Sequence, residues 1–341
     1  MSGIHVIRSY SWLTFVVVHA LLLVDYTLSA GFAIGAVAAA PEPVSLHGSD
    51  HLTALLFSVF AVEFILAGDL ILQQRLFVGL VLALIICILS FRFRFLDLSA
   101  SLLALLLGTI IFGLGGWSFS LPMLCFFVLS SALSKISENR RRDINSLFQK
   151  SSRRDIGQVL ANSGVAAALV LVWYFDGDPL WYFLFLGAVT AVTADTWATE
   201  IGVLLGRRPR SIITWQPVPP GTSGGITLAG IIGAVAGAST IVAAAWLVRP
   251  GVPFGVAEIL FLIAGGVLAH LVDSVLGATI QAQHLCPVCG KKTERLQHCD
   301  GLATRFHTGW SWVNNDVVNG FCALSGALIV LAVFWLADVS I

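Results

Sequence analysis

Long apolar runs are the feature of this sequence that most restricts its fold. They lie at 12–24, 52–67, 76–91, 98–116, 117–134, 156–175, 181–206, 224–248, 256–281 and 317–337. Most of them approach the roughly 20 residues that an α-helix needs to cross a bilayer. Asp, Glu, Lys and Arg make up only 11% of the 341 residues, whereas soluble domains use about a quarter. We therefore predict an all-α fold, a polytopic transmembrane bundle of about ten helices.

The distribution of basic residues predicts which side of the membrane the connections face. The polar connections 135–155, 207–223 and 282–315 hold most of the Lys and Arg residues of the second half. Two predicted spans separate each connection from the next, so all three lie on one side, and the positive-inside rule makes that side cytoplasmic. The first run follows Arg8 like a signal peptide, but it has no clean cleavage site, and we retain it as a membrane helix. The net charge of zero gives no indication of a nucleic-acid partner.

Polar side chains recur on four predicted helices, near the ends that border the basic connections. Within each set most residues share one helical face, although Glu200 lies about 140° from Asp195 on an ideal helix. The sets are Arg154, Gln158 and Asn162; Asp195, Thr196 and Glu200; His270, Asp273, Ser274 and Gln281; and Asn315, Asp316 and Asn319. A carboxylate inside a membrane is costly enough to indicate a functional site. The alternative for each residue is an interhelical hydrogen bond or a helix cap.

A glycine-rich segment follows the helix that carries Asp195. It comprises Gly221, Thr222, Ser223, Gly224 and Gly225, and it leads directly into the next predicted helix. Backbone N–H groups that point inward from such a loop, next to a helix N-terminus, favour the binding of phosphate. Arg210 supplies positive charge nearby. The alternative is a simple turn, because Pro and Gly also make turns.

Three of the six cysteines lie in one polar loop. Cys286 and Cys289 form a C-x-x-C pair, and His298 and Cys299 follow nine to ten residues later. This spacing resembles a zinc knuckle with three or four ligands, so we expect the loop 282–315 to be a small cytoplasmic Cys/His loop with a possible structural zinc ion. His284 or His307 could substitute for a ligand. A redox-active or empty thiol pair is the alternative.

Five strings of the second half are similar to those of the domain-of-unknown-function-92 family. They are R-D-I-G-Q-V-L-A-N-S-G, A-D-T-W-A-T-E-I-G, V-P-P-G-T-S-G-G, D-S-V-L-G-A-T-I-Q and N-N-D-V-V-N. That family includes the plastid phytyl-phosphate kinase and the animal transmembrane protein nineteen. The pattern D-x-x-A-x-x-x-G, here Asp195, Ala198 and Gly202, also resembles the CTP-dependent dolichol and phytol kinases. We expect 1–90 to form N-terminal transmembrane helices outside the resemblance, and 91–341 to form the family-like catalytic domain.

The resemblance implies transfer of the γ-phosphoryl group of CTP to a prenyl monophosphate, which yields a prenyl diphosphate. In that reaction we expect Asp195 and Asp273 to hold Mg²⁺, with Asp316 or Glu200 as a further ligand. The remaining polar residues would bind the lipid phosphate and the nucleotide; they are Arg154, Gln158, Asn162, Thr196, Arg210, Gly221, Thr222, Ser223, Gly224, Gly225, Ser274, Gln281, Asn315 and Asn319. No general base is required, because a phosphate acceptor with a second pKa of about 6 is already ionised.

Two other activities suit the same residues. A transporter or flippase for polyprenyl phosphate or another anionic lipid would use the same basic and polar cavity. Transporters commonly have repeated halves and midplane sites, whereas the halves of this chain are dissimilar and its polar groups gather towards one side. A cytidylyltransferase acting on a lipid phosphate would release pyrophosphate instead of CDP.

Overall fold

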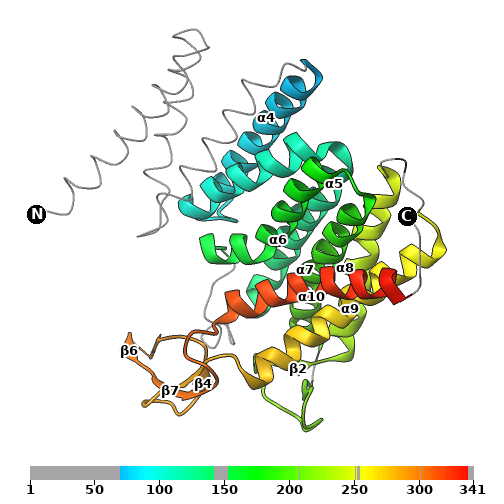
Figure 1. Ribbon diagram of the computed structural model, residues 1–341. Helices are drawn as coiled ribbons and strands as arrows, with labels where there is room; N and C mark the ends of the chain where they lie inside the picture. Colours follow the sequence, from blue (N-terminus) through cyan, green and yellow to red (C-terminus); the bar gives the residue numbers. More distant parts are fainter. Residues whose placement is uncertain are drawn as a thin grey trace, which may run out of the picture.

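The protein is described by a computed structural model that covers residues 70–141, 153–206, 208–249, 251, 254–299 and 301–336. These residues form seven helices long and apolar enough to cross a membrane (Figure 1). The helices are α4 (Leu70–Arg92), α5 (Leu98–Arg141), α6 (Ile156–Asp176), α7 (Pro179–Leu205), α8 (Leu228–Leu247), α9 (Val256–Thr279) and α10 (Asn315–Leu336). The predicted all-α membrane fold is confirmed.

The number of helices in the described residues is seven rather than about ten, for two reasons. The predicted spans 12–24 and 52–67 lie outside the described residues. The predicted spans 98–116 and 117–134 both belong to α5, which is 44 residues long.

Helix α5 reverses its direction at Gly116. This glycine has φ 63° and ψ −163°, outside the helical region, in a left-handed conformation that glycine adopts without steric cost. Before the break, Asp97 donates its N–H to Arg154 O at the start of α6. After it, Ser118 bonds to the backbone at the end of α8, and Ser134 bonds to the last third of α7. The two halves of α5 therefore run antiparallel, as the two separate apolar runs predict.

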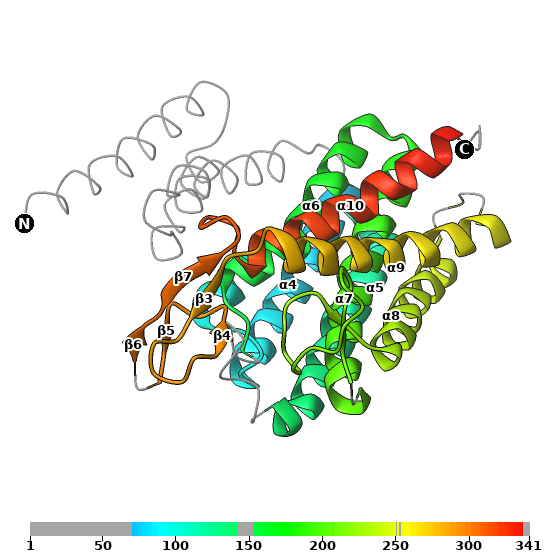
Figure 2. The ribbon, with the colours of Figure 1, turned by 90° about the horizontal axis from the view of Figure 1, so that it is seen from below.

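Helix α7 is the centre of the bundle. The stretch from Tyr182 to Ala194 is buried without interruption. Helix α7 packs against α5, α6, α8, α9 and α10, and these five helices pack against one another in a ring around it (Figure 2). Since α7 has a protein neighbour on every side, two polar residues on different faces of it can both lie away from lipid.

Local sequence signals explain where several helices begin. Asp155 caps α6 by accepting a hydrogen bond from Gln158 N at 3.1 Å. Asp178 caps α7 in the same way, with Pro179 at the first helical position. Thr227 caps α8 and accepts from Gly230 N at 2.9 Å. Such caps satisfy backbone N–H groups that the helix itself leaves without a partner.

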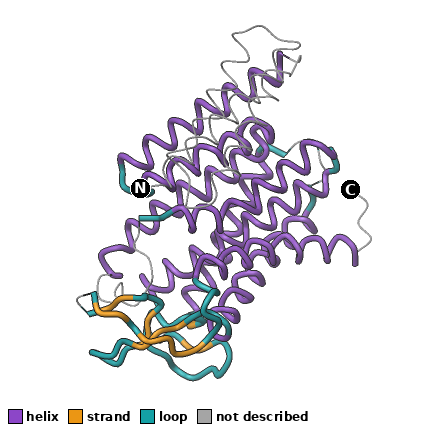
Figure 3. The backbone as a smooth tube through the Cα atoms, turned by 60° about the vertical axis from the view of Figure 1, so that its left-hand side comes forward, coloured by secondary structure: helices purple, strands orange, loops and turns teal. Residues whose placement is uncertain are grey.

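Short strands gather at one end of the bundle (Figure 3). Strands β1 (Arg210–Ser211) and β2 (Gly225–Ile226) pair in the α7–α8 connection. The α9–α10 connection holds β3 (Gln283–Leu285), β4 (Lys292–Thr293), β5 (Gln297–His298), β6 (Leu302–Ala303) and β7 (Arg305–Thr308), with the sheet order β4-β3-β7 and a β5–β6 pair. We call residues 282–314 the cysteine module. Its two ends are joined where Ala282 N donates to Val313 O at 2.8 Å.

Candidate functional site

A polar cavity of about 430 Å³ lies at the end of the bundle that carries the cysteine module. Its walls come from α5 to α10, together with the α7–α8 connection and one residue of the cysteine module. The predicted site residues that line it are Arg154, Gln158, Asn162, Asp195, Thr196, Glu200, Gly221, Thr222, Ser223, Gly224, Gly225, Asp273, Ser274, Gln281, Asn315 and Asn319. Residues from distant parts of the sequence thus meet in one space.

Of the residues predicted to bind Mg²⁺, the lipid phosphate or the nucleotide, two are not among those that line the cavity. Asp316 is in the first turn of α10, beside the lining residue Asn315. Arg210 is exposed, and its NH1 donates to Trp215 O at 2.9 Å. Among the described lining residues, Arg154 is the one that carries a guanidinium or ammonium group. The positive charge that Arg and Lys bring to the described cavity lining therefore lies at the start of α6.

The carboxyl groups of Asp195 and Asp273 lie together at the cavity. The two carboxyl groups are near enough to interact electrostatically. Oδ2 of Asp273 is buried, and no hydrogen bond reaches it within the described part of the chain. Adjacent carboxylates repel when both are ionised, and a divalent cation between them removes that repulsion. Because Mg²⁺ typically takes one or two carboxylates and completes its shell with phosphate and water, this pair fits Mg²⁺.

His270 joins this pair from the same helix as Asp273. Its Nδ1 lies 2.9 Å from Oδ1 of Asp195. The imidazole is buried and lines the cavity. Its place in one stripe with Asp273 and Gln281 put it on the polar face of α9, but no local pattern indicated its partner. The contact holds one oxygen of Asp195 in place.

Glu200 is held by α5 rather than by the acidic pair. Its side chain is 4% exposed. Oε1 accepts a hydrogen bond from Ser134 Oγ at 2.7 Å, and Oε2 accepts one from Ser137 Oγ. Although about 140° separates Glu200 from Asp195 on an ideal helix, both line the cavity, because α7 has protein on all sides.

The backbone of the glycine-rich loop lines the cavity and packs against α9. Gly221 and Gly224 have φ of 84° and 73°. A Cβ added to Gly224 would lie 2.6 Å from Ser274 O, so only glycine permits this close approach to α9. No hydrogen bond recorded within the described ranges takes up the N–H groups of Ser223 or Gly224, and both residues line the cavity. The loop can therefore donate backbone N–H groups to an anion.

Glu294 is a cavity residue that sequence reasoning missed. It belongs to the cysteine module, directly after β4. Its Oε1 accepts hydrogen bonds from Ser223 Oγ at 2.9 Å and from Gln281 Nε2 at 2.8 Å. A single glutamate in a polar loop has no periodicity that would distinguish it in the sequence. The cysteine module therefore contributes a wall to the cavity.

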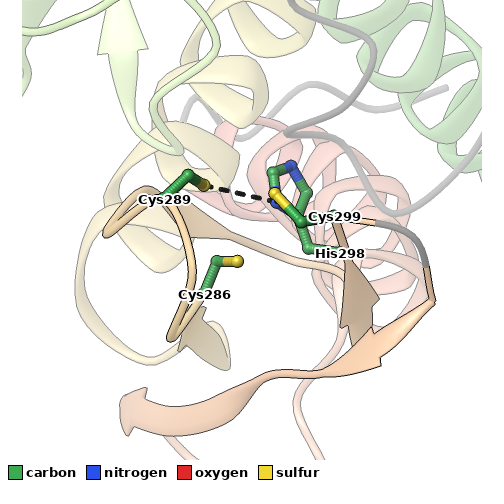
Figure 4. Close-up of side chains that lie close together, drawn as sticks. All are labelled: Cys286, Cys289, His298 and Cys299. Carbon is green, nitrogen blue, oxygen red and sulfur yellow. Dashed lines mark hydrogen bonds between the residues drawn. The ribbon is translucent and has the colours of Figure 1, made fainter.

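The cysteine module also contains a cluster of potential metal ligands (Figure 4). Cys286, Cys289, His298 and Cys299 each offer one ligand atom, and these atoms all lie within 4.8 Å of one another. Hydrogen bonds from the Cys289 and Val288 backbone lower the pKa of Cys286 to about 6. The hydrogen bond with Cys289 raises the pKa of Cys299 to about 11. The four residues are those that the sequence predicted to lie together.

His284 and His307, the predicted substitutes, are not members of this cluster among the described residues. His284 packs its ring edge-on against Phe306, with the ring centroids 5.9 Å apart, and burial lowers its pKa. His298 and Cys299 both belong to the cluster although they are adjacent in the chain. The left-handed backbone of Cys299, with φ 42°, lets both side chains point to the same centre.

Comparison with known proteins gives one family and several relatives. The family model described as integral membrane protein DUF92 matches residues 81–327. Protein PGR of Arabidopsis thaliana is 31% identical over 241 residues, which are 64% of this chain and 83% of that protein. An uncharacterized membrane protein of Synechocystis, sll0875, is 28% identical over 233 residues, 67% of this chain and 79% of the relative. The chloroplastic protein VTE6 of Arabidopsis thaliana is 23% identical over 236 residues, 67% of this chain and 62% of the relative. No solved structure matches.

Proposed function

This chain belongs to the DUF92 family of integral membrane proteins, and we propose that it transfers the γ-phosphoryl group of CTP to a prenyl monophosphate, such as a phytyl or geranylgeranyl phosphate. The observation that carries the proposal is the meeting of Asp195, Asp273 and the glycine-rich loop in one polar cavity at the end of a transmembrane bundle. The resemblance to the family of the plastid phytyl-phosphate kinase supports the choice of acceptor.

Asp195 and Asp273 would hold Mg²⁺ at the cavity. When bound, the ion would neutralise negative charge on the phosphate oxygens. The contact between His270 Nδ1 and Asp195 Oδ1 keeps the Asp195 carboxyl in one orientation. Glu200, which accepts hydrogen bonds from two serines of α5, would act as a further ligand, directly or through water.

Positive charge and N–H donors would bind the phosphates. Arg154 lies at the start of α6, and its guanidinium is 5.6 Å from the centre of the Phe126 ring, which orients it towards the cavity it lines. The glycine-rich loop, which lines the same cavity, would donate backbone N–H groups. The amides of Asn162, Asn315 and Asn319 would complete hydrogen bonds to phosphate or to metal-bound water. Positioning and charge neutralisation are what phosphoryl transfer requires of a protein.

The acceptor chemistry removes the need for a general base. A prenyl monophosphate is largely ionised at neutral pH, because its second pKa is about 6, and one of its oxygens can attack the γ-phosphorus directly. The apolar surfaces of the helices would accept the prenyl tail. The nucleotide would arrive from the side on which the basic connections lie, which the positive-inside rule makes the cytoplasm.

Product identification tests the proposal. Purified protein is incubated with Mg²⁺, each nucleoside triphosphate in turn and a panel of prenyl monophosphates, and the products are analysed by mass spectrometry. The proposal predicts CDP and a prenyl diphosphate, both absent with Asp195→Asn. Release of pyrophosphate together with a cytidylylated lipid would contradict the kinase proposal and indicate cytidylyl transfer. Movement of chemically unchanged lipid across the vesicle membrane would contradict the kinase proposal and indicate transport.

A further inference from the structure

We propose that Cys286, Cys289, His298 and Cys299 bind one zinc ion, and that this ion holds Glu294 against the glycine-rich loop of the cavity. The zinc site stands on the geometry of the cysteine module alone. That the loop held in this way binds a nucleotide rests on the proposed function. The cysteine module would then be a metal-dependent wall of the cavity rather than a separate appendage.

The distances between the ligand atoms match tetrahedral zinc. With Zn–S of about 2.3 Å and Zn–N of about 2.0 Å, a tetrahedral site separates a sulfur from a nitrogen by roughly 3.5 Å. Nδ1 of His298 lies 3.5 Å from Sγ of Cys289 and 3.2 Å from Sγ of Cys299. All ligand atoms lie within 4.8 Å, so a small inward movement closes the site. Three thiolates and one imidazole make a Cys₃His set, which is typical of structural zinc.

The backbone around the cysteines has the form of a metal-binding turn. Gly290 N donates to Cys286 O, and Cys286 N donates to Lys291 O, each at 3.0 Å. Gly290, directly after the second ligand, has φ 68°, and Cys299 has φ 42°. A positive φ at a non-glycine residue is strained and persists where the surroundings determine it. A bond between Cys299 Sγ and a metal ion would hold the residue in this strained conformation.

The cysteine module has too small a core to order itself. Of its described residues, only Ala282, Cys286, Thr293 and Val313 are buried. Its strands are two to four residues long. Units without a sizeable apolar core generally need a disulfide or a metal ion to fold. The cysteines of the described residues are free, which leaves the metal as the stabilising element.

Glu294 connects the metal site to the cavity, because the segment that carries it is held between metal ligands. It lies between the second and third ligands, five residues after Cys289 and four before His298, so both flanking segments would be fixed by the ion. Thr304 donates through Oγ1 to Arg295 O at 2.7 Å and through its N–H to Leu296 O at 2.9 Å, and so secures the segment next to Glu294. From there the carboxylate accepts hydrogen bonds from Ser223 and Gln281.

Metal analysis of the full-length protein, purified in detergent without a metal-affinity tag, tests the zinc site. We expect about one zinc ion per chain in the wild type. Cys289→Ser and Cys299→Ser should lose it, while Cys125→Ser, a half-buried cysteine of α5, should keep it. A folded wild-type protein without zinc, or one in which thiol titration finds a disulfide among the four residues, overturns the proposal.

Hydrogen exchange of residues 219–227 tests the link to the cavity and needs neither nucleotide nor turnover. Cys289→Ser should accelerate exchange of this loop about tenfold, through loss of the two hydrogen bonds of Glu294. Glu294→Ala, which removes the acceptor of both hydrogen bonds, should accelerate it as well while keeping the zinc, and Lys292→Gln, an exposed neighbour, should change neither. If the loop exchanges at the wild-type rate in both Cys289→Ser and Glu294→Ala, the module does not hold the loop. Since these readouts involve no catalysis, their failure is distinct from failure of the proposed kinase activity.

Discussion

Nδ1 of His270 lies 2.9 Å from Oδ1 of Asp195, and this contact joins α9 to the central helix α7 beside Asp273. We assign His270 a positioning role for Asp195. His270→Ala should raise the Mg²⁺ concentration that gives half-maximal activity, and lower turnover, by about 10- to 100-fold, as is usual when the residue that orients a metal ligand is lost. Titration of activity against Mg²⁺ measures both effects.

The conservative variant separates positioning from packing. His270→Asn places an amide where Nδ1 stands and should recover much of the Mg²⁺ affinity. Equal loss in His270→Asn and His270→Ala, with an unchanged Mg²⁺ requirement in both, would contradict a positioning role.

The acidic pair should be required for turnover but not for folding. Asp195→Asn and Asp273→Asn keep the side-chain volume and a hydrogen-bonding group, while they remove the charges that hold Mg²⁺. Each should reduce turnover by at least about 100-fold, with little change in thermal unfolding. Asp176→Asn, at the exposed turn between α6 and α7, is the matched control and should retain wild-type turnover.

Gly224 should tolerate no side chain. Its φ of 73° and the 2.6 Å separation between an added Cβ and Ser274 O both oppose alanine. Gly224→Ala should cost about 1–3 kcal/mol in the local stability of the loop and weaken nucleotide binding more than tenfold. Gly320→Ala is the control, because a Cβ there meets nothing within 4 Å. Equal nucleotide affinity in the two variants would argue against a role for the loop in binding.

The contacts of Glu200 with α5 predict a non-additive effect on stability. Glu200→Ala leaves the hydroxyl group of Ser134 buried without its acceptor, while Ser137 Oγ keeps its bond to Ser134 O; the change should cost about 1–3 kcal/mol. Adding Ser134→Ala and Ser137→Ala should recover part of the lost thermal stability, since no donor then remains unsatisfied. Additive losses in the triple variant would mean that Glu200 stabilises the helices in another way.

The cavity should open to the cytoplasm. Trp215 lies at the cavity end of the bundle and is 64% exposed, while Phe175 lies at the opposite end and is 70% exposed. In intact cells, a membrane-impermeant maleimide should modify Phe175→Cys but not Trp215→Cys, with the labelled peptides read by mass spectrometry. The reverse pattern would place the basic connections outside and contradict the positive-inside assignment.

The regularity of a helix let the sequence predict most of the residues that meet in the cavity. Asn162 and Asp273 could be singled out because a polar side chain within an apolar run is unfavourable in lipid, and their spacing put each on one face. The four members of the cysteine cluster could be grouped because their spacing along the chain is itself a metal-ligand pattern. Both inferences depend on residues that lie only a few positions apart in the sequence.

What lies across a helical face could not be predicted in the same way. The partners Glu294 and Ser223, or His270 and Asp195, are separated by 71 and 75 residues. Their contacts depend on the ring of helices around α7, which no local pattern encodes. The two spans 98–116 and 117–134 were predicted from their apolar runs, and the structure adds that a single backbone break at Gly116 connects them. Arg210 was expected near the phosphates, but its hydrogen bond to Trp215 O keeps it outside the cavity lining.

Binding of Mn²⁺ in place of Mg²⁺, followed by electron paramagnetic resonance, tests the central claim most directly. We expect the wild-type protein to bind one Mn²⁺ in the presence of CTP, with coupling to the phosphorus nuclei of the nucleotide, and expect Asp195→Asn and Asp273→Asn to lose that signal. Mn²⁺ bound with equal affinity by the wild type and by both variants would show that the two aspartates and the glycine-rich loop do not form a nucleotide–metal site.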